Sequence, residues 1–326
     1  MKKSGMFLAA LAACMFLLTG AAFAAVEFKF AHSGSLEHQY QIGAEQFKKL
    51  VEEKSGGEMK VTIFPQAQLG GERDLAEGVR MGTIEMSSVA AGNMAGFVPE
   101  LQVFGVPFLF QTREQVYTVL DGPVGKDLAD IMLGKGFVNL SIWEVGFRNI
   151  TNNTRPVKTP DDMKGLKIRV QESKLMMGLV SALGAVPTPM PFGEVYSALQ
   201  TGVIEGAENN WPSYFSTSHY EVAKYFTLDG HTRVPEILIA SKTTMDKLSK
   251  EDQEIIRKAA KDSIPFQIKL WKEFEKVSEE KVTAAGSIVT HLTPEAVAEF
   301  QKAMDPLYSE LKPELQEMVR KIREVQ

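Results

Sequence analysis

Strand and helix patterns alternate along the chain, and this order constrains the fold more than any other feature. Residues 25–32 (AVEFKFAH) and 58–65 (EMKVTIFP) alternate apolar and polar side chains, which is typical of strands. Between them, residues 37–57 carry apolar side chains at helical spacing and end at Gly56-Gly57. The order strand, helix, strand predicts a βαβ unit, and a chain built from such units predicts an α/β fold.

The rest of the chain continues this order. Ser249 begins a long helical stretch that Pro265 should bend. Thr159 and the three residues after it form a helix start, and residues 203–211 are interpreted as a connection leading out of a helix that ends at Gly202. Further strands are predicted at residues 84–89, 137–147, 164–173, 236–241 and 286–292, and further helices at residues 112–133, 173–183 and 191–202.

The first residues have the pattern of an export signal. Two lysines precede an unbroken apolar run, Met6–Leu18, and Ala22-Phe23-Ala24 supplies the small residues of a cleavage site. The run is too short to anchor the chain in a bilayer. We therefore expect residues 1–24 to be a signal peptide and the remaining chain to be released as a soluble protein into the periplasm.

Cys14 is the only cysteine, and it lies within the expected signal peptide. Leu11–Cys14 (LAAC) also resembles a lipoprotein cleavage box, but cleavage there would leave the apolar residues 15–18 at the new N-terminus. Lipoprotein anchoring is therefore the less favoured alternative. Cleavage after Ala24 leaves no cysteine, so neither a disulfide nor thiol chemistry is expected.

The length and the charge of the chain bear on its domain number and on its possible partners. A chain of 326 residues exceeds one typical domain, and a formal net charge of −5 argues against a nucleic-acid partner. No stretch rich in proline, glycine and serine separates two halves of the chain. We therefore expect two lobes that are joined by several hinge crossings. We also expect the protein to be a monomer. Lobe I is expected over residues 25–147 with a segment near 233–262 returning to it, and lobe II over residues 148–232 with part of 263–326 packing on it.

The sequence has no strong catalytic signature. It lacks the patterns HExxH and GxSxG and a Walker loop, and its five histidines do not have metal-ligand spacing. We therefore expect neither an enzyme nor a metal site nor a cofactor.

Instead, polar residues stand among apolar or aromatic ones, several of them near strand ends, where ligands of open α/β sheets bind. Arg148 and Arg169 are charged residues beside apolar strands, and Glu72 begins a helix after two glycines. Simpler interpretations also exist. Arg169 can be a solvent-facing strand residue and Glu72 can offset a helix dipole, while Asn209 can form a turn and Phe192 can pack in the core. The further residues of this set are His32, Ser87, Ser88, Asn210, Trp211 and Tyr214.

Two long segments carry a family resemblance. Residues 146–173 (GFRNITNNTRPVKTPDDMKGLKIRVQES) and 184–214 (GAVPTPMPFGEVYSALQTGVIEGAENNWPSY) resemble the solute-binding proteins of tripartite ATP-independent periplasmic (TRAP) transporters, the family of the C4-dicarboxylate-binding subunit DctP. The resemblance covers nearly the whole mature chain. It implies a two-lobed periplasmic-binding-protein-like fold, a long helix spanning both lobes, a cleft that closes on an organic acid, and membrane permease subunits as partners.

The resemblance also implies roles for individual residues. Arg169 is expected to pair with the ligand carboxylate, Arg148 to add to that contact, Asn209 to reach the ligand, and Phe192 to pack nearby. A guanidinium suits this task because its parallel N–H donors match the two oxygens of a carboxylate.

Departures from the simplest dicarboxylate pattern bear on the ligand. Residues 208–214 (ENNWPSY) resemble uronate-binding members, and Glu72 would repel a second carboxylate. We therefore favour a hexuronate such as glucuronate, galacturonate or mannuronate, with His32, Trp211 and Glu236 as further ligand-binding candidates. The alternatives are a C4-dicarboxylate, a periplasmic enzyme acting on sugar acids, and a subunit that presents its ligand to a sensor kinase.

Overall fold

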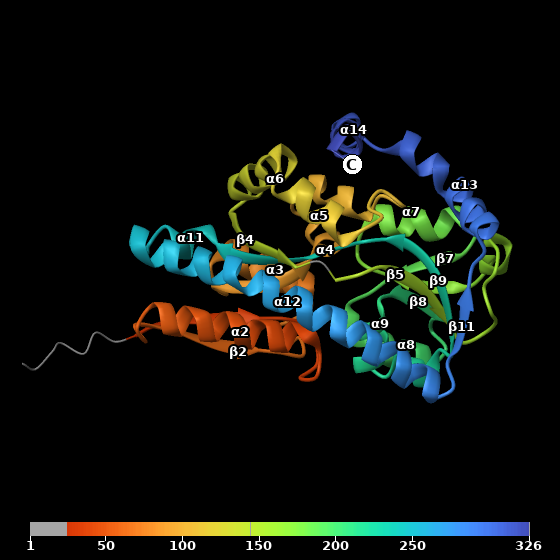
Figure 1. The fold of residues 1–326 in the computed structure, drawn as a ribbon, viewed down its shortest axis with the longest axis horizontal. Helices are drawn as coiled ribbons and strands as arrows, with labels where there is room; N and C mark the ends of the chain where they lie inside the picture. Colours follow the sequence, from red (N-terminus) through yellow and green to blue (C-terminus); the bar gives the residue numbers. More distant parts are fainter. Residues whose placement is uncertain (1–24, 144, 326) are drawn as a thin grey trace, which may run out of the picture.

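Two mixed β-sheets surrounded by helices make up the protein, which is described here by a computed structural model (Figure 1). The structure describes residues 25–143 and 145–325, so the expected signal peptide lies outside the described residues. The strand order is β2-β1-β3-β10-β4 in the five-stranded sheet and β11-β9-β5-β8-β6-β7 in the six-stranded sheet. The predicted α/β class is confirmed.

The five-stranded sheet is built from the N-terminal part of the chain and one returning strand. β1 (Val26–Ala31) pairs in parallel with β2 (Met59–Phe64) and β3 (Met86–Ala90). β10 (Glu236–Ser241) is inserted antiparallel between β3 and β4 (Phe137–Trp143). The helices of this part of the chain are α2 (Gln39–Lys54), α3 (Glu72–Met81), α4 (Ala91–Met94), η1 (Pro99–Gly105), α5 (Arg113–Leu120), α6 (Pro123–Gly134) and α11 (Lys242–Met245).

The six-stranded sheet takes its strands from the middle of the chain and one from near the C-terminus. They are β5 (Arg148–Asn152), β6 (Lys167–Val170), β7 (Val186–Pro189), β8 (Gly206–Asn209), β9 (Tyr225–Thr232) and β11 (Ile288–His291). Its short helices are η2 (Pro160–Met163), α7 (Lys174–Ala182), η3 (Phe192–Glu194), α8 (Val195–Gln200), α9 (Trp211–Ser216) and α10 (His219–Val222). The chain crosses from one sheet to the other between β4 and β5 and again between β9 and β10.

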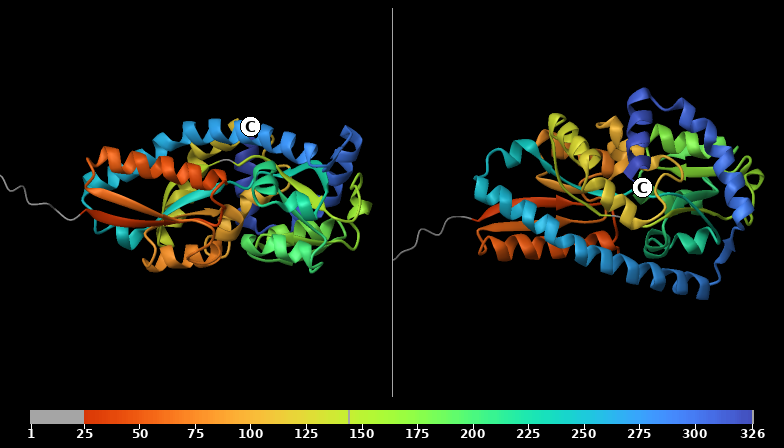
Figure 2. Two further views of the ribbon diagram at one scale, coloured as in Figure 1. Left: turned by 90° about the horizontal axis from the view of Figure 1, so that it is seen from below. Right: turned by 45° about the horizontal axis from the view of Figure 1, so that its top comes forward.

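The long helix α12 (Lys250–Ala284) connects the two halves of the molecule. It runs from beside α2 to beside α9 (Figures 1 and 2). Ile256 packs in the core next to the five-stranded sheet, whereas Val282 packs with Trp211 and Phe226 next to the six-stranded sheet. Pro265 lies inside α12 without ending it. Within the described part of the chain, no helix combines the length and apolar character needed to cross a membrane.

The C-terminal helices also touch both halves. α13 (Pro294–Glu310) packs on α7, while α14 (Pro313–Val325) packs on η1, α5 and α6. Figure 2 shows α13 and α14 curving over the molecule from one sheet toward the other.

Several predicted elements differ from the structure. The helix predicted at 112–133 is two helices, because the extended backbone of Gly122 separates them and Pro123 begins the second. The strand predicted at 137–147 ends at Trp143, and the helix predicted at 191–202 is a short 3-10 turn followed by α8. The connection predicted at 203–211 contains β8, which pairs with β5 and β6.

Candidate functional site

A narrow cavity lies between the two sheets. Its volume of about 20 Å³ has room for roughly one water molecule. Side chains from both halves form its wall: Tyr40, Glu72, Ala90 and Asn93 from the first, and Arg148, Arg169, Gln171, Phe192, Asn209 and Ser213 from the second. In this arrangement the cavity is too small for a molecule much larger than water.

Arg169 lies on β6, which the alternation of Ile168 and Val170 with polar residues predicts. Its side chain is buried, and its Nε and Nη2 atoms donate hydrogen bonds to the carbonyl oxygen of Met190 at 3.0 and 2.8 Å. No carboxylate among the described residues forms an ion pair with it. Burial lowers the pKa of Arg169 to about 10, and the negative charge of Glu208 opposes this shift. The guanidinium is therefore charged at neutral pH and retains donor capacity for an anion.

Arg148, at the start of β5, is already paired within the protein. It forms an ion pair with Glu208 through Nε, and its Nη2 donates to Glu208 Oε1 at 2.9 Å and to the Glu208 carbonyl oxygen at 2.6 Å. Its Nη1 donates to Asn209 Oδ1 at 3.2 Å. Burial alone would raise the pKa of Glu208, but Arg148 and His231 lower it to about 2.

His231 and Asp229 extend this buried network. His231 Nε2 lies 3.4 Å from Glu208 Oε2, and its Nδ1 lies 2.7 Å from Asp229 Oδ2. Burial by itself would lower the pKa of His231, but Asp229 and Glu208 raise it to about 9. Two cations and two carboxylates thus balance one another, so the charge of Arg148 is compensated, unlike that of Arg169.

Glu72 is held by three donors. Its Oε1 accepts from Ser33 Oγ at 2.7 Å, and its Oε2 accepts from the Ala90 N–H at 3.0 Å and Asn93 Nδ2 at 2.7 Å. The carboxylate therefore does more than offset the dipole of α3, because it links three segments at the cavity wall.

Polar contacts cross between the halves on either side of the cavity. Asn93 Oδ1 accepts from the Glu172 N–H at 3.1 Å. On the other side, His38 Nε2 lies 3.2 Å from Ser213 Oγ. His38 Nδ1 accepts from the Tyr40 N–H as the cap of α2, so Nε2 carries the proton and donates to Ser213. Burial lowers the pKa of His38 to about 3, with a smaller contribution from His32.

The structure brings five of the eight predicted site residues into the cavity wall: Arg169, Arg148, Asn209, Glu72 and Phe192. The other three lie outside the wall. His32 is buried with Nε2 2.9 Å from Gln41 Oε1, and Trp211 stacks on Phe226 with ring centroids 3.8 Å apart. Glu236 is buried, and burial together with Glu72 raises its pKa well above the usual range.

Sequence reasoning missed Tyr40, Asn93, Gln171 and Ser213, which also line the cavity. Gln171 had a usable signal, because it stands two residues after Arg169 and so faces the same side of an extended segment. Tyr40 and Asn93 belong to helices that approach the cavity only through tertiary packing.

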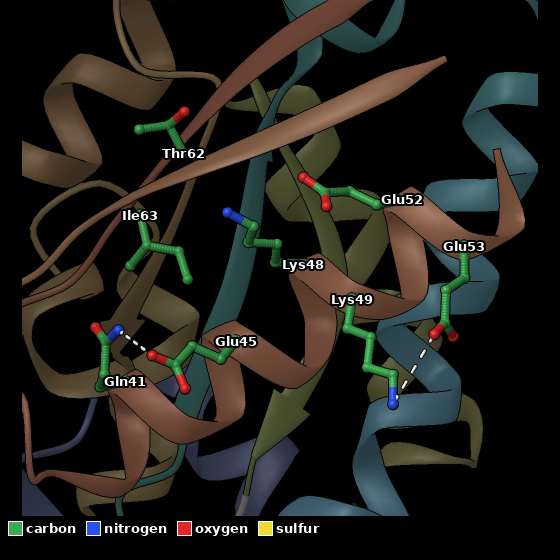
Figure 3. Close-up of a pocket in the computed structure, with 8 residues that line it drawn as sticks. All are labelled: Gln41, Glu45, Lys48, Lys49, Glu52, Glu53, Thr62 and Ile63. Atoms are coloured by element: carbon green, nitrogen blue, oxygen red, sulfur yellow. Dashed lines mark hydrogen bonds and ion pairs between the residues drawn. The ribbon is translucent and has the colours of Figure 1, made fainter. Parts of the chain in front are cut away.

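A second hollow lies on the outer surface along α2 and β2 (Figure 3). Lys49 lies 3.9 Å from Glu53, Lys60 lies 3.9 Å from Glu52, and Gln41 donates to Glu45 at 2.8 Å. It contains no buried charge comparable to Arg169, and it is not the candidate site. Among the described residues, no group of three or more histidine, cysteine, aspartate or glutamate side chains is placed to hold a metal ion.

Comparisons with known proteins identify the family of this chain. Residues 30–314 match the family model of the bacterial extracellular solute-binding protein, family 7 (DctP). The structure resembles a TRAP periplasmic solute-binding protein from Bradyrhizobium in complex with D-galacturonate, with a TM-score of 0.88, 40% identity, and coverage of 91% of this chain and 99% of that one.

Two further relatives extend the comparison. A TRAP solute-binding protein from Chromohalobacter salexigens with bound D-glucuronate has a TM-score of 0.88 and 35% identity over 92% of this chain and all of that one (100%). The 2,3-diketo-L-gulonate-binding periplasmic protein YiaO of Escherichia coli is 35% identical over 90% of this chain and 89% of its own length. This chain belongs to the DctP family of TRAP-transporter solute-binding proteins.

Proposed function

We propose that this protein captures a sugar acid, with hexuronates such as glucuronate and galacturonate favoured, and delivers it to the membrane permease subunits of a TRAP transporter. It acts in the periplasm as a monomer and returns its ligand unchanged. Residues 25–147 and 233–262 form lobe I, and residues 148–232 with part of 263–326 form lobe II. The ligand enters when these lobes separate.

Arg169 carries the proposal. It is a buried, charged guanidinium without an ion-pair partner among the described residues, and it faces a cavity at the ends of several strands. Because an unpaired buried charge is unfavourable, the closed cleft favours a ligand whose carboxylate pairs with it. Arg148 and Asn209 support this contact from β5 and β8, and Phe192, whose ring centroid lies 5.9 Å from the Arg169 guanidinium carbon, covers it.

Glu72 favours a monocarboxylate. Its oxygens already accept three hydrogen bonds at the opposite side of the cavity. A second carboxylate there would be repelled, whereas a hydroxyl group could donate to the remaining lone pair. The uronate-bound relatives support the same class of ligand.

A thermal-shift experiment tests the proposed function. The purified mature protein is melted with D-galacturonate, D-glucuronate, D-mannuronate or succinate. Because a ligand that binds only the folded protein stabilises it by mass action, at least one uronate should raise the melting temperature. Stabilisation by succinate and by no uronate would contradict the proposed ligand class, and conversion of a uronate during incubation would contradict a binding function.

A further inference from the structure

Gln171 is a buried polar residue of the cavity wall that lacks a hydrogen-bond partner. The residue is 4% exposed, and its Oε1 atom is fully buried without a partner among the described residues. Its Nε2 atom likewise forms no hydrogen bond with any of them. Buried carboxamides in native proteins are normally hydrogen-bonded, so this one calls for a ligand group as its partner.

The position of Gln171 matches a small carboxylate held by Arg169. The two residues are two apart along an extended segment, so their side chains leave the same face about 6.6 Å apart along the strand. Both line the cavity. When a carboxylate pairs with Arg169, the carbon atoms beyond it, and the groups they carry, lie within reach of Gln171.

Gly92 makes room for the Gln171 carboxamide. A Cβ atom at this position would lie 2.1 Å from Gln171 Oε1 and 3.0 Å from its Cδ. Gly92 does not have a positive φ angle. The close approach of the carboxamide, and not backbone conformation, is therefore what requires glycine here.

Asn93 follows Gly92 and Glu172 follows Gln171, and these two residues are joined by a hydrogen bond. The Glu172 N–H donates to Asn93 Oδ1 at 3.1 Å, while Asn93 Nδ2 donates to Glu72 Oε2 at 2.7 Å. Gly92 and Asn93 follow β3 of the five-stranded sheet, whereas Gln171 and Glu172 follow β6 of the six-stranded sheet. The carboxamide therefore lies beside a hydrogen bond that joins the two halves.

We propose that Gln171 is a specificity-determining residue that hydrogen-bonds a hydroxyl group of the bound acid, and that Gly92 is required for its position. This proposal rests on the proposed function in taking the ligand to be a hydroxylated carboxylic acid. A carboxamide offers both donors and an acceptor, and a hydroxyl group can serve either. A site built to bond a hydroxyl discriminates strongly against an analogue that lacks it.

Calorimetric titration with three ligands, two that carry hydroxyl groups and one that does not, tests this role. The probes are D-galacturonate, D-glucuronate and tetrahydropyran-2-carboxylate, which keeps the ring and the carboxylate but has no hydroxyl group. The variants are Gln171→Met and Gly92→Ala, and the control is Gln301→Met, an exposed glutamine on α13. Methionine has similar length and flexibility but cannot replace the carboxamide hydrogen bond.

Both site variants should weaken uronate binding about 10-fold or more, while affinity for tetrahydropyran-2-carboxylate changes less than about twofold. The control should bind all probes like the parent protein. An equal loss for every probe would show that Gln171 only supports the structure, and unchanged uronate affinity would show that it does not contact the ligand. Either result overturns the proposal.

The proposed ligand class can be wrong while the proposed role of Gln171 is right, and a second ligand pair separates the two outcomes. If the parent protein binds neither uronate, then malate and succinate, which differ by one hydroxyl group, replace the uronate pair. Gln171→Met must then lower the ratio of malate to succinate affinity, and an unchanged ratio overturns the role of Gln171. If the parent protein binds none of these acids, both proposals are wrong.

Discussion

Arg148 and Glu208 form a buried ion pair on adjacent strands of the six-stranded sheet, with Arg148 Nη2 2.9 Å from Glu208 Oε1. Both side chains are almost inaccessible to solvent. The pair is continued by His231 and Asp229, so one of the two arginines at the cavity is neutralised from within the protein. This leaves Arg169 as the cavity arginine that is available for a ligand carboxylate.

Breaking this pair should destabilise the fold. Glu208→Gln leaves two buried cations, Arg148 and His231, facing one carboxylate, and removal of one partner of a buried pair typically costs about 3–5 kcal/mol. We expect a loss of about 3 kcal/mol in the free energy of unfolding, measured by urea denaturation. Glu194→Gln, an exposed position, is the control. A Glu208→Gln variant as stable as the control would show that the network contributes little.

Acid should weaken the fold through two histidines beside the cavity. Burial lowers the pKa of His38 and of His219 to about 3 from the ordinary value of 6.5, aided at His38 by His32 and at His219 by Arg169. Between these values the unfolded chain binds more protons, so stability falls as pH decreases from 6.5 toward 3. Urea denaturation at pH 7 and pH 4.5 should show a loss on the order of 2 kcal/mol for each histidine. His38→Asn keeps the helix cap and should reduce this dependence, so an unchanged dependence in that variant would contradict the assignment.

His231 is expected to give the opposite pH dependence, with the stability of the fold decreasing as pH rises. Its pKa rises to about 9 in the folded protein because Asp229 and Glu208 outweigh the effect of burial. The folded state therefore binds the extra proton between 6.5 and 9, and this stabilisation is complete below pH 6.5 and disappears as pH rises through 9. Unfolding measured at pH 7 and pH 9.5 should show lower stability at the higher pH. His231→Gln should flatten that change, and an equally steep decline in the variant would count against His231 as its source.

The strands recognised from sequence were those with a clear apolar pattern. β1, β2, β6 and β10 alternate or run apolar, and their locations were confirmed. β7 (VPTP) contains two prolines, and β8 (GAEN) is short and polar, so neither has a strand signal of its own. Both exist because neighbouring strands supply their hydrogen bonds. Local patterns could not predict elements that tertiary pairing creates.

The same limit applies to the cavity. Arg169, Arg148 and Asn209 could be located through the family resemblance, and the structure brings them together. The role of Glu208 could not be predicted from the sequence. A glutamate between alanine and asparagine has no local sign that it is buried against an arginine 60 residues away. Asn93 contacts Glu172 and Gly92 lies against Gln171, and both contacts depend on how two separate sheets are arranged.

The affinity of Arg169 variants for D-galacturonate tests the central claim most directly. Calorimetric titration should show that Arg169→Ala loses about 30-fold or more in affinity, because removing one partner of a buried charged pair costs about 2–5 kcal/mol. Arg169→Lys should also bind weakly, since lysine keeps the charge but lacks the fork of parallel donors. Arg73→Ala, at an exposed position on α3, should bind like the parent protein. Near-parental affinity in Arg169→Ala would contradict the account.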